Sequence, residues 1–134
     1  MDDTIRLVLN GAPCAVTADV PPTTTLLDWL RGLGLTGTKE GCAEGDCGAC
    51  TVVLEGADGT RTPVNACLCV MGQLHGRAVR TVEGLGADHA VPRAMAEGDA
   101  TQCGFCTPGI VMSAWAHTRA GGDPHEALAG NLCR

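Results

Sequence analysis

The chain opens with a stretch in which apolar and polar side chains alternate. Residues 4–9 follow this two-residue period, and the Asn10-Gly11 dipeptide that comes next is typical of a tight hairpin turn. Residues 13–17 can then return as the second strand. The pattern therefore predicts an N-terminal β-hairpin.

A helical period follows the hairpin. Three leucines share one face of a predicted helix over residues 26–31, which Thr24 or Thr25 can cap. Residues 51–55 and 77–82 are rich in β-branched side chains and predict two further strands. Two strands, one helix and then more strands is the element order of a β-grasp fold.

The second half of the chain has a different pattern. A glycine-rich linker at 84–87 leads to three predicted helices, over residues 91–97, 108–118 and 124–129. Thr107 and Asp123 each precede a proline, as expected for a capping residue followed by proline in the first helical turn. We therefore expect a helical second half whose last two helices form a hairpin.

Composition excludes several classes of protein. With 134 residues, of which 45% are apolar and 18% charged, the chain suits two small domains and is too apolar for a disordered tail. A formal charge of −6 argues against a nucleic-acid partner. No apolar run approaches the ~20 residues that cross a bilayer, and the first residues lack the features of a signal peptide. We expect a cytoplasmic protein with no membrane partner.

Nine cysteines and 19 glycines change this picture most. In a reducing compartment, clustered cysteines bind metal more often than they form disulfides, and an odd number fits poorly with complete pairing. The cysteines are therefore interpreted as candidate metal ligands.

The first constellation lies between the predicted helix and the next strands. Cys42, Cys47 and Cys50 stand at C-x4-C-x2-C, and Cys67 follows after a strand, which is the plant-type ferredoxin spacing for a [2Fe-2S] cluster. Glycines within this segment let backbone N–H groups approach the sulfurs closely. Structural zinc is the competing interpretation, although zinc sites favour two C-x2-C pairs.

The second constellation belongs to the helical half. Cys103 and Cys106 form a C-x2-C just before the helix at 108–118, and Cys133 follows the next helix. A helix hairpin would return Cys133 to the C-x2-C, near a positive helix N-terminus. From the residues alone, this set could belong to a cluster, a zinc knuckle or a redox-active thiol pair.

The motifs around these cysteines resemble the two-cluster iron–sulfur unit of the xanthine oxidase family of molybdenum hydroxylases. The resemblance extends from about Ile5 to the last residue and rests on residues 37–50, 64–67, 81–84, 102–109 and 130–134. Residues 73–77 and the short hairpin before Cys133 most resemble the small subunit of bacterial xanthine dehydrogenases. Carbon monoxide, aldehyde and isoquinoline oxidoreductases share the core motifs and stay open.

The resemblance implies an α+β fold in two domains. Residues 1–83 would form a plant-type ferredoxin-like β-grasp [2Fe-2S] domain, and residues 84–134 a small all-α [2Fe-2S]-binding domain. Electrons from a molybdopterin centre on a large partner subunit would pass through both clusters to FAD on another subunit or domain. The implied metal ligands are Cys42, Cys47, Cys50 and Cys67 for the first cluster, and Cys103, Cys106 and Cys133 for the second.

Two further expectations follow from the resemblance. Gln102 resembles the family residue whose amide approaches the pterin, whereas a solvent-facing amide is the alternative. The family holds its second cluster with a C-x2-C and a C-x-C, and this sequence ends at Arg134 before a final cysteine. Either the chain is an incomplete product of a longer gene or the second site is defective, and the resemblance, which implies a following FAD domain, favours truncation.

The remaining cysteines, the histidines and one charged pair lead to weaker expectations, and a second function stays open. Cys14 and Cys69 are expected to be small buried hydrophobic residues, and the four histidines to serve surfaces or turns. Lys39 and Glu40 either shape the first cysteine loop or form a solvated pair. The alternative function is a stand-alone ferredoxin-like electron carrier with a zinc-binding helical appendix.

Overall fold

The structure, a computed structural model, describes residues 3–86 and 88–133. Ala87 of the predicted linker and the terminal Arg134 lie outside the described residues. The elements are β1 (Arg6–Leu9), β2 (Ala12–Ala15), α1 (Leu26–Gly32), β3 (Thr51–Glu55), β4 (Arg61–Asn65), the 3₁₀ turn η1 (Met71–Gln73), β5 (Ala78–Arg80), the 3₁₀ turn η2 (Val82–Gly84), α2 (Ala90–Glu97), α3 (Thr107–Ala120) and α4 (Pro124–Ala127).

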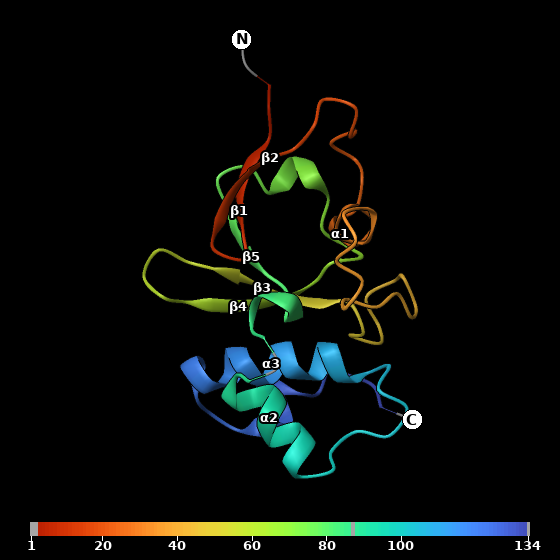
Figure 1. Cartoon of the computed structure of the whole chain (residues 1–134), viewed down its shortest axis with the longest axis vertical. Helices are drawn as coiled ribbons and strands as arrows, with labels where there is room; N and C mark the ends of the chain where they lie inside the picture. Colours follow the sequence, from red (N-terminus) through yellow and green to blue (C-terminus); the bar gives the residue numbers. More distant parts are fainter. Residues whose placement is uncertain (1–2, 87, 134) are drawn as a thin grey trace.

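Five strands form one mixed sheet in the order β2-β1-β5-β3-β4 (Figure 1). β1 pairs in parallel with β5, and the other neighbours are antiparallel. Helix α1 packs into the curve of the sheet, and the predicted β-grasp is confirmed. The helical half lies on the opposite side, where α3 runs beneath β3 and β4.

Strand β3 contributes to two hydrophobic cores because its side chains alternate between the faces of the sheet. Val52 and Leu54 belong to the larger core, which also contains the leucines of α1. Val53 points to the other face, where it packs with Met112 and Trp115 of α3. The helical half therefore uses the back of the sheet to complete its own small core, and the two halves pack as layers (Figure 1).

Helix α1 forms where the leucine pattern predicted it. Thr25 is its N-cap, and its side chain accepts a hydrogen bond from the Asp28 N–H at 3.1 Å. Leu26, Leu27 and Leu30 are almost completely buried. Because seven residues are too few for a stable isolated helix, this burial is what stabilises α1.

A cationic side chain fastens the far end of α3 to the sheet. The Arg61 guanidinium on β4 lies 3.9 Å from the centre of the Trp115 ring. Its Nη1 also donates to the Trp115 carbonyl and to Thr118 Oγ1, both at 3.0 Å. These contacts join residues 54 and 57 positions apart in the sequence and stabilise the docking of α3.

The structure corrects several sequence predictions. Strand β4 was missed because Pro63 interrupts its pattern, a residue tolerated here at the edge of the sheet. Thr107 is not the cap of α3: Cys106 occupies that position without a capping side-chain bond, and Thr107 is already helical. Asp123 does cap α4, where its carboxylate accepts from the His125 N–H at 2.9 Å.

Candidate metal centres

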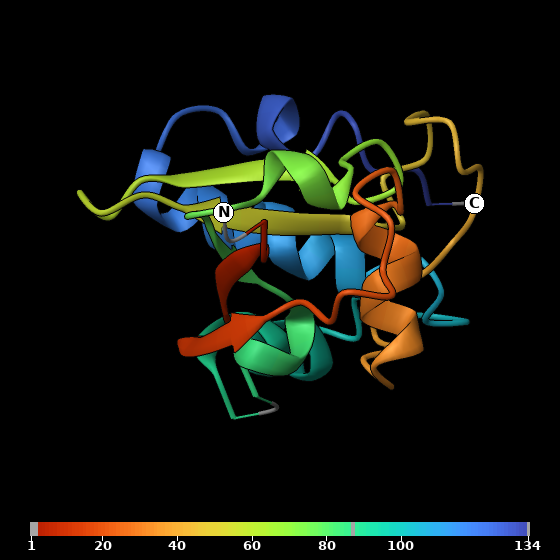
Figure 2. The same ribbon diagram turned by 90° about the horizontal axis from the view of Figure 1, so that it is seen from above.

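Three segments distant in sequence meet at one end of the molecule. They are the first cysteine loop (residues 41–50), the segment 99–106 before α3, and residues 131–133 (Figures 1 and 2). They enclose a cleft of about 690 Å³ whose lining includes Cys47, Cys103, Cys106 and Cys133. Both predicted cysteine sets therefore lie at this end.

The first cysteine loop wraps its backbone around the Cys42 sulfur. The N–H groups of Glu44, Asp46 and Cys47 lie 3.4, 3.2 and 3.3 Å from Cys42 Sγ and donate to it. Such a turn needs left-handed backbone, which Gly45 supplies with a φ of 86° and Ala43 with 57°. The loop is therefore shaped to place N–H donors around an anionic sulfur.

The four thiols of the first set associate as two pairs. Cys42 and Cys47 each donate a backbone N–H to the other's Sγ at 3.3 Å. The Cys67 N–H points in the same way at Cys50 Sγ, 3.5 Å away. Cys42 and Cys47 lie on the half-exposed loop, whereas Cys50 and Cys67 are buried in the larger core.

The two pairs differ in electrostatic environment. Hydrogen bonds from the Glu44 and Cys47 backbones lower the pKa of the Cys42 thiol to about 7, which favours the thiolate. Burial raises the pKa of the Cys50 thiol to about 11. The Cys42 sulfur is thus disposed to bind a cation, while a metal must displace the proton of the Cys50 thiol.

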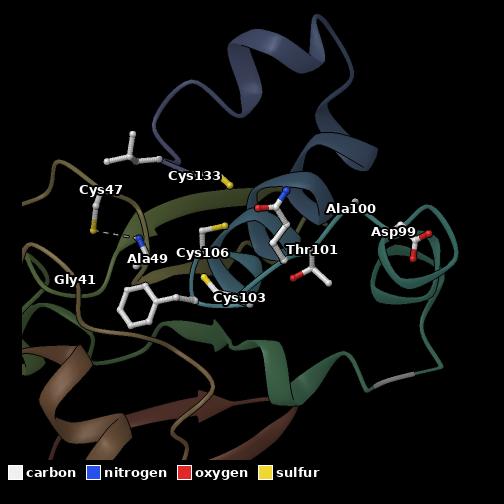
Figure 3. A pocket seen from close by; sticks show the side chains of 13 residues that line it. Gly41, Cys47, Ala49, Asp99, Ala100, Thr101, Cys103, Cys106 and Cys133 are labelled. Atoms are coloured by element: carbon white, nitrogen blue, oxygen red, sulfur yellow. Dashed lines mark hydrogen bonds between the residues drawn. The ribbon is translucent and has the colours of Figure 1, made fainter.

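The thiols of the second set converge at the N-terminal end of α3. Figure 3 shows Cys103, Cys106 and Cys133 facing a common space in the cleft, with Cys47 on its other side. Burial raises the pKa of the Cys106 thiol, and the neighbouring thiols of Cys133 and Cys103 raise it further. A backbone hydrogen bond at Cys106 lowers the pKa, but by less than these effects raise it. The helix hairpin has returned Cys133 to the C-x2-C as predicted.

The two cysteine sets are joined by hydrogen bonds that sequence reasoning missed. The Leu132 N–H donates to the Cys47 carbonyl at 2.8 Å. The side-chain amide of Asn131 donates to the Gly48 carbonyl at 3.1 Å and accepts from Ser113 Oγ at 2.6 Å. Asn131 lies in the segment 130–134 that carries part of the family resemblance, but nothing in the sequence indicates that its amide bonds to Gly48, 83 residues away.

The remaining candidates occupy less specialised positions. Gln102 is exposed and lines the cleft beside Cys103. Cys14 and Cys69 are half-buried against the larger core, and all nine cysteines, which lie within the described ranges, are free thiols. His89 caps α2 by accepting from the Val91 N–H at 3.2 Å, and His75 Nδ1 accepts from the Arg6 N–H at 3.0 Å.

The donor set fits a binuclear iron–sulfur cluster. The four thiols of the first set form two pairs, which matches a [2Fe-2S] cluster with two protein ligands on each iron. N–H groups directed at the sulfurs supply the polar surroundings that a charged cluster requires.

Comparison with protein families and relatives agrees with this chemistry. Residues 9–72 match the 2Fe-2S iron-sulfur cluster binding domain, and residues 81–134 match the [2Fe-2S] binding domain. Xanthine dehydrogenase of Emericella nidulans is 49% identical over 146 residues, which cover 99% of this chain and 11% of that protein. Aldehyde oxidase 1 of Cavia porcellus is 50% identical over 146 residues, covering 98% and 11%. The chain thus spans about a tenth of these oxidoreductases.

Solved structures extend the comparison. Quinoline 2-oxidoreductase from Pseudomonas putida 86 superposes with a TM-score of 0.85 and 37% identity, covering 98% of this chain and 82% of that one. Aldehyde oxidoreductase from Desulfovibrio desulfuricans ATCC 27774 gives a TM-score of 0.87 and 36% identity, covering 98% and 15%. With two [2Fe-2S]-binding domains in the same order, the chain belongs to the iron–sulfur domains of the xanthine oxidase family of molybdenum hydroxylases.

Proposed function

We propose that this chain relays electrons in a molybdenum hydroxylase, from a molybdopterin centre through two [2Fe-2S] clusters to FAD. The proposal rests above all on the meeting of both cysteine sets at one end of the molecule, where the Leu132 N–H bonds to the Cys47 carbonyl at 2.8 Å. A carrier with independent metal sites would not require this contact. The chain itself performs no substrate chemistry, and molybdopterin and FAD belong to partner subunits or domains.

In this proposal, Cys42, Cys47, Cys50 and Cys67 hold the first cluster. The two pairs of thiols and the N–H donors directed at Cys42 Sγ support the assignment. When bound, the cluster accepts and releases one electron at a time. Backbone donors stabilise negative charge on sulfur and raise the reduction potential, whereas burial of the Cys50 side lowers it.

Cys103, Cys106 and Cys133 provide three ligands of the second cluster. Their support is the convergence of the three thiols in the cleft. Residues 1–83 and 84–134 are proposed as the domains that hold the first and second clusters.

The cleft indicates the direction of transfer. Gln102 lies on its exposed lining beside the second set of thiols, and its amide offers two donors and one acceptor to a pterin edge. Phe105 and Leu132, 47% and 58% exposed, add apolar surface around the cleft for a large partner subunit. We therefore assign the second cluster to the molybdopterin side and the first to the FAD side.

In this proposal the partner subunit binds the substrate, and the substrate class is inferred from the relatives of this chain. Xanthine dehydrogenases and aldehyde oxidases occur among the relatives, and the segment 73–77 favours xanthine dehydrogenase in this proposal. The cysteine-rich composition suits the reducing cytoplasm. No helix of the described residues is long and apolar enough to cross a membrane.

Metal analysis of the full-length holoprotein tests the proposal. We expect about four irons per chain and no zinc. Anaerobic reduction by substrate should produce two distinct [2Fe-2S] signals in the electron paramagnetic resonance (EPR) spectrum, one from each cluster. About two irons and one zinc would instead support the stand-alone carrier with a zinc-binding appendix. Xanthine and an aldehyde, compared as reductants, distinguish the two substrate classes.

A further inference from the structure

We infer that Asn131 is a positioning residue that fixes the distance between the two metal centres. The inference rests on the proposed function, because it requires that both cysteine sets hold clusters that exchange electrons. Asn131 is neither a predicted metal ligand nor a surface residue. Its side chain lies half-buried between the first cysteine loop, β3 and α3.

The amide of Asn131 uses both of its polar ends. Nδ2 donates to the Gly48 carbonyl at 3.1 Å and to Thr51 Oγ1 at 3.3 Å. Oδ1 accepts from Ser113 Oγ at 2.6 Å. Thr51 Oγ1 donates in turn to the same Gly48 carbonyl at 2.7 Å, so this carbonyl is held from two directions. The amide thereby joins a loop, a strand and a helix.

The surrounding backbone leaves the clamp little freedom. A Cβ on Gly109 of α3 would overlap the Gly48 carbonyl oxygen, and a Cβ on Gly48 would overlap the Gly130 carbonyl oxygen. The backbones of the first cysteine loop, α3 and the final segment are therefore in direct contact. A side chain that joins them here has to be short and must combine a donor with an acceptor, which Asn provides.

The position of the clamp relates it to both sets of thiols. Asn131 lies two residues before Cys133, and Gly48 lies between Cys47 and Cys50. The neighbouring Leu132 N–H donates to the Cys47 carbonyl at 2.8 Å. Displacement of Asn131 from Gly48 would therefore move Cys133 relative to the first loop. Electron tunnelling weakens exponentially with distance, so a small displacement slows transfer between clusters.

A second contact between the two halves allows the positioning role of Asn131 to be distinguished from a general stabilising role. The far end of α3 is held to β4 by Arg61, which stacks on Trp115 and bonds to its carbonyl. Loss of Arg61 should loosen the packing of the helical half without altering contacts beside the thiols. Arg61→Met is therefore the matched control for the Asn131 variants. It loosens the same interface at the end far from the metal centres.

The test compares Asn131→Asp, Asn131→Ala, Ser113→Ala and Arg61→Met in the full-length holoprotein. Asp keeps the acceptor for Ser113 but loses the donors, and Ala loses both. We expect the two Asn131 variants to weaken the magnetic splitting between the two reduced clusters in EPR spectra and to slow electron equilibration between them after flash reduction. Ser113→Ala should produce a smaller change in the same direction, and Arg61→Met should leave both readouts as in the wild type.

Each other outcome has a defined meaning. Wild-type splitting and wild-type equilibration in both Asn131 variants, with four irons retained, would overturn the inference while leaving the proposed function intact. Equal changes in Arg61→Met would assign the effect to general loosening and overturn it as well. If the Asn131 variants lose a cluster, Ser113→Ala decides: altered splitting supports the inference and wild-type splitting refutes it. About two irons in the wild type would refute the proposed function and this inference together.

Discussion

Gly109, in the first turn of α3, packs against the carbonyl oxygen of Gly48, in the first cysteine loop, so closely that a Cβ on Gly109 would overlap this oxygen. Gly48 itself has a φ of 72°, a left-handed conformation that favours glycine. Elsewhere the two halves pack through side chains, such as Val53 against Met112. Beside the metal centres they meet backbone to backbone, so no side chain separates Gly109 from the first cysteine loop.

Gly109→Ala should therefore destabilise the protein although alanine is the better helix former. The new Cβ cannot be accommodated without moving the Gly48 carbonyl, and such overpacking costs about 1–3 kcal/mol in the free energy of unfolding. The intrinsic helix preference of alanine offsets up to about 1 kcal/mol of this cost. Thermal and urea unfolding of the holoprotein measure the net change.

Gly32→Ala is the matched control for this substitution. Gly32 is also helical, at the end of α1, and a Cβ there would meet nothing within 4 Å. We expect this variant to be unchanged or more stable by up to about 1 kcal/mol. Equal stability of the two alanine variants would show that the contact between Gly109 and Gly48 is not tight.

Arg61→Met should lower stability by about 1–2 kcal/mol because it removes a cation–π contact and two hydrogen bonds while keeping the aliphatic stem. Arg119→Met, on α3, is the control. Arg119 is exposed and makes one long bond, 3.4 Å, to the Asp58 carbonyl, so its loss should change stability by less than about 0.5 kcal/mol. Equal shifts of the urea midpoint in both variants would contradict the anchoring role of Arg61.

Much of the fold could be predicted because its determinants are local. The leucine spacing of α1 and the β-branched run of β3 express the periods of helix and strand directly. The spacing of Cys42, Cys47 and Cys50 is equally local, since a cluster requires its ligands at fixed short separations. The residues that determine each of these features lie within a few positions of one another in the sequence.

The missed features depend on contacts between distant segments. Strand β4 is stabilised by pairing with β3, although Pro63 weakens its own strand signal. Two partners of Asn131, Gly48 in the first loop and Thr51 in β3, are 83 and 80 residues away, and no pattern around Asn131 indicates them. The requirement for glycine at position 109 is equally invisible in the sequence, because it arises from the Gly48 carbonyl on the other side of the domain contact.

Cys47→Ser should remove the first cluster and about half of the iron in the holoprotein. A hydroxyl is a poor replacement for a soft thiolate on iron, and Cys47 faces Cys42 within one pair of proposed ligands. Cys14 is a half-buried residue on the edge strand β2, and Cys14→Ser should leave the iron content unchanged. The measurement is iron per chain with EPR quantification, and equal iron loss in both variants would refute the ligand assignment.

Iron removal should destabilise the β-grasp domain, because a cluster held by Cys42 and Cys67 closes the chain between them as a cross-link does. Loop-closure entropy for a segment of this length corresponds to about 3 kcal/mol. The strands have at most five residues and α1 has seven, so these elements depend on the shared core that includes Cys50 and Cys67. Trp29, 7% exposed in this core, reports its unfolding by fluorescence in a Trp115→Phe background. Reduction and chelation should lower its thermal midpoint, and an unchanged midpoint after complete iron loss would show that the apolar core alone stabilises the domain.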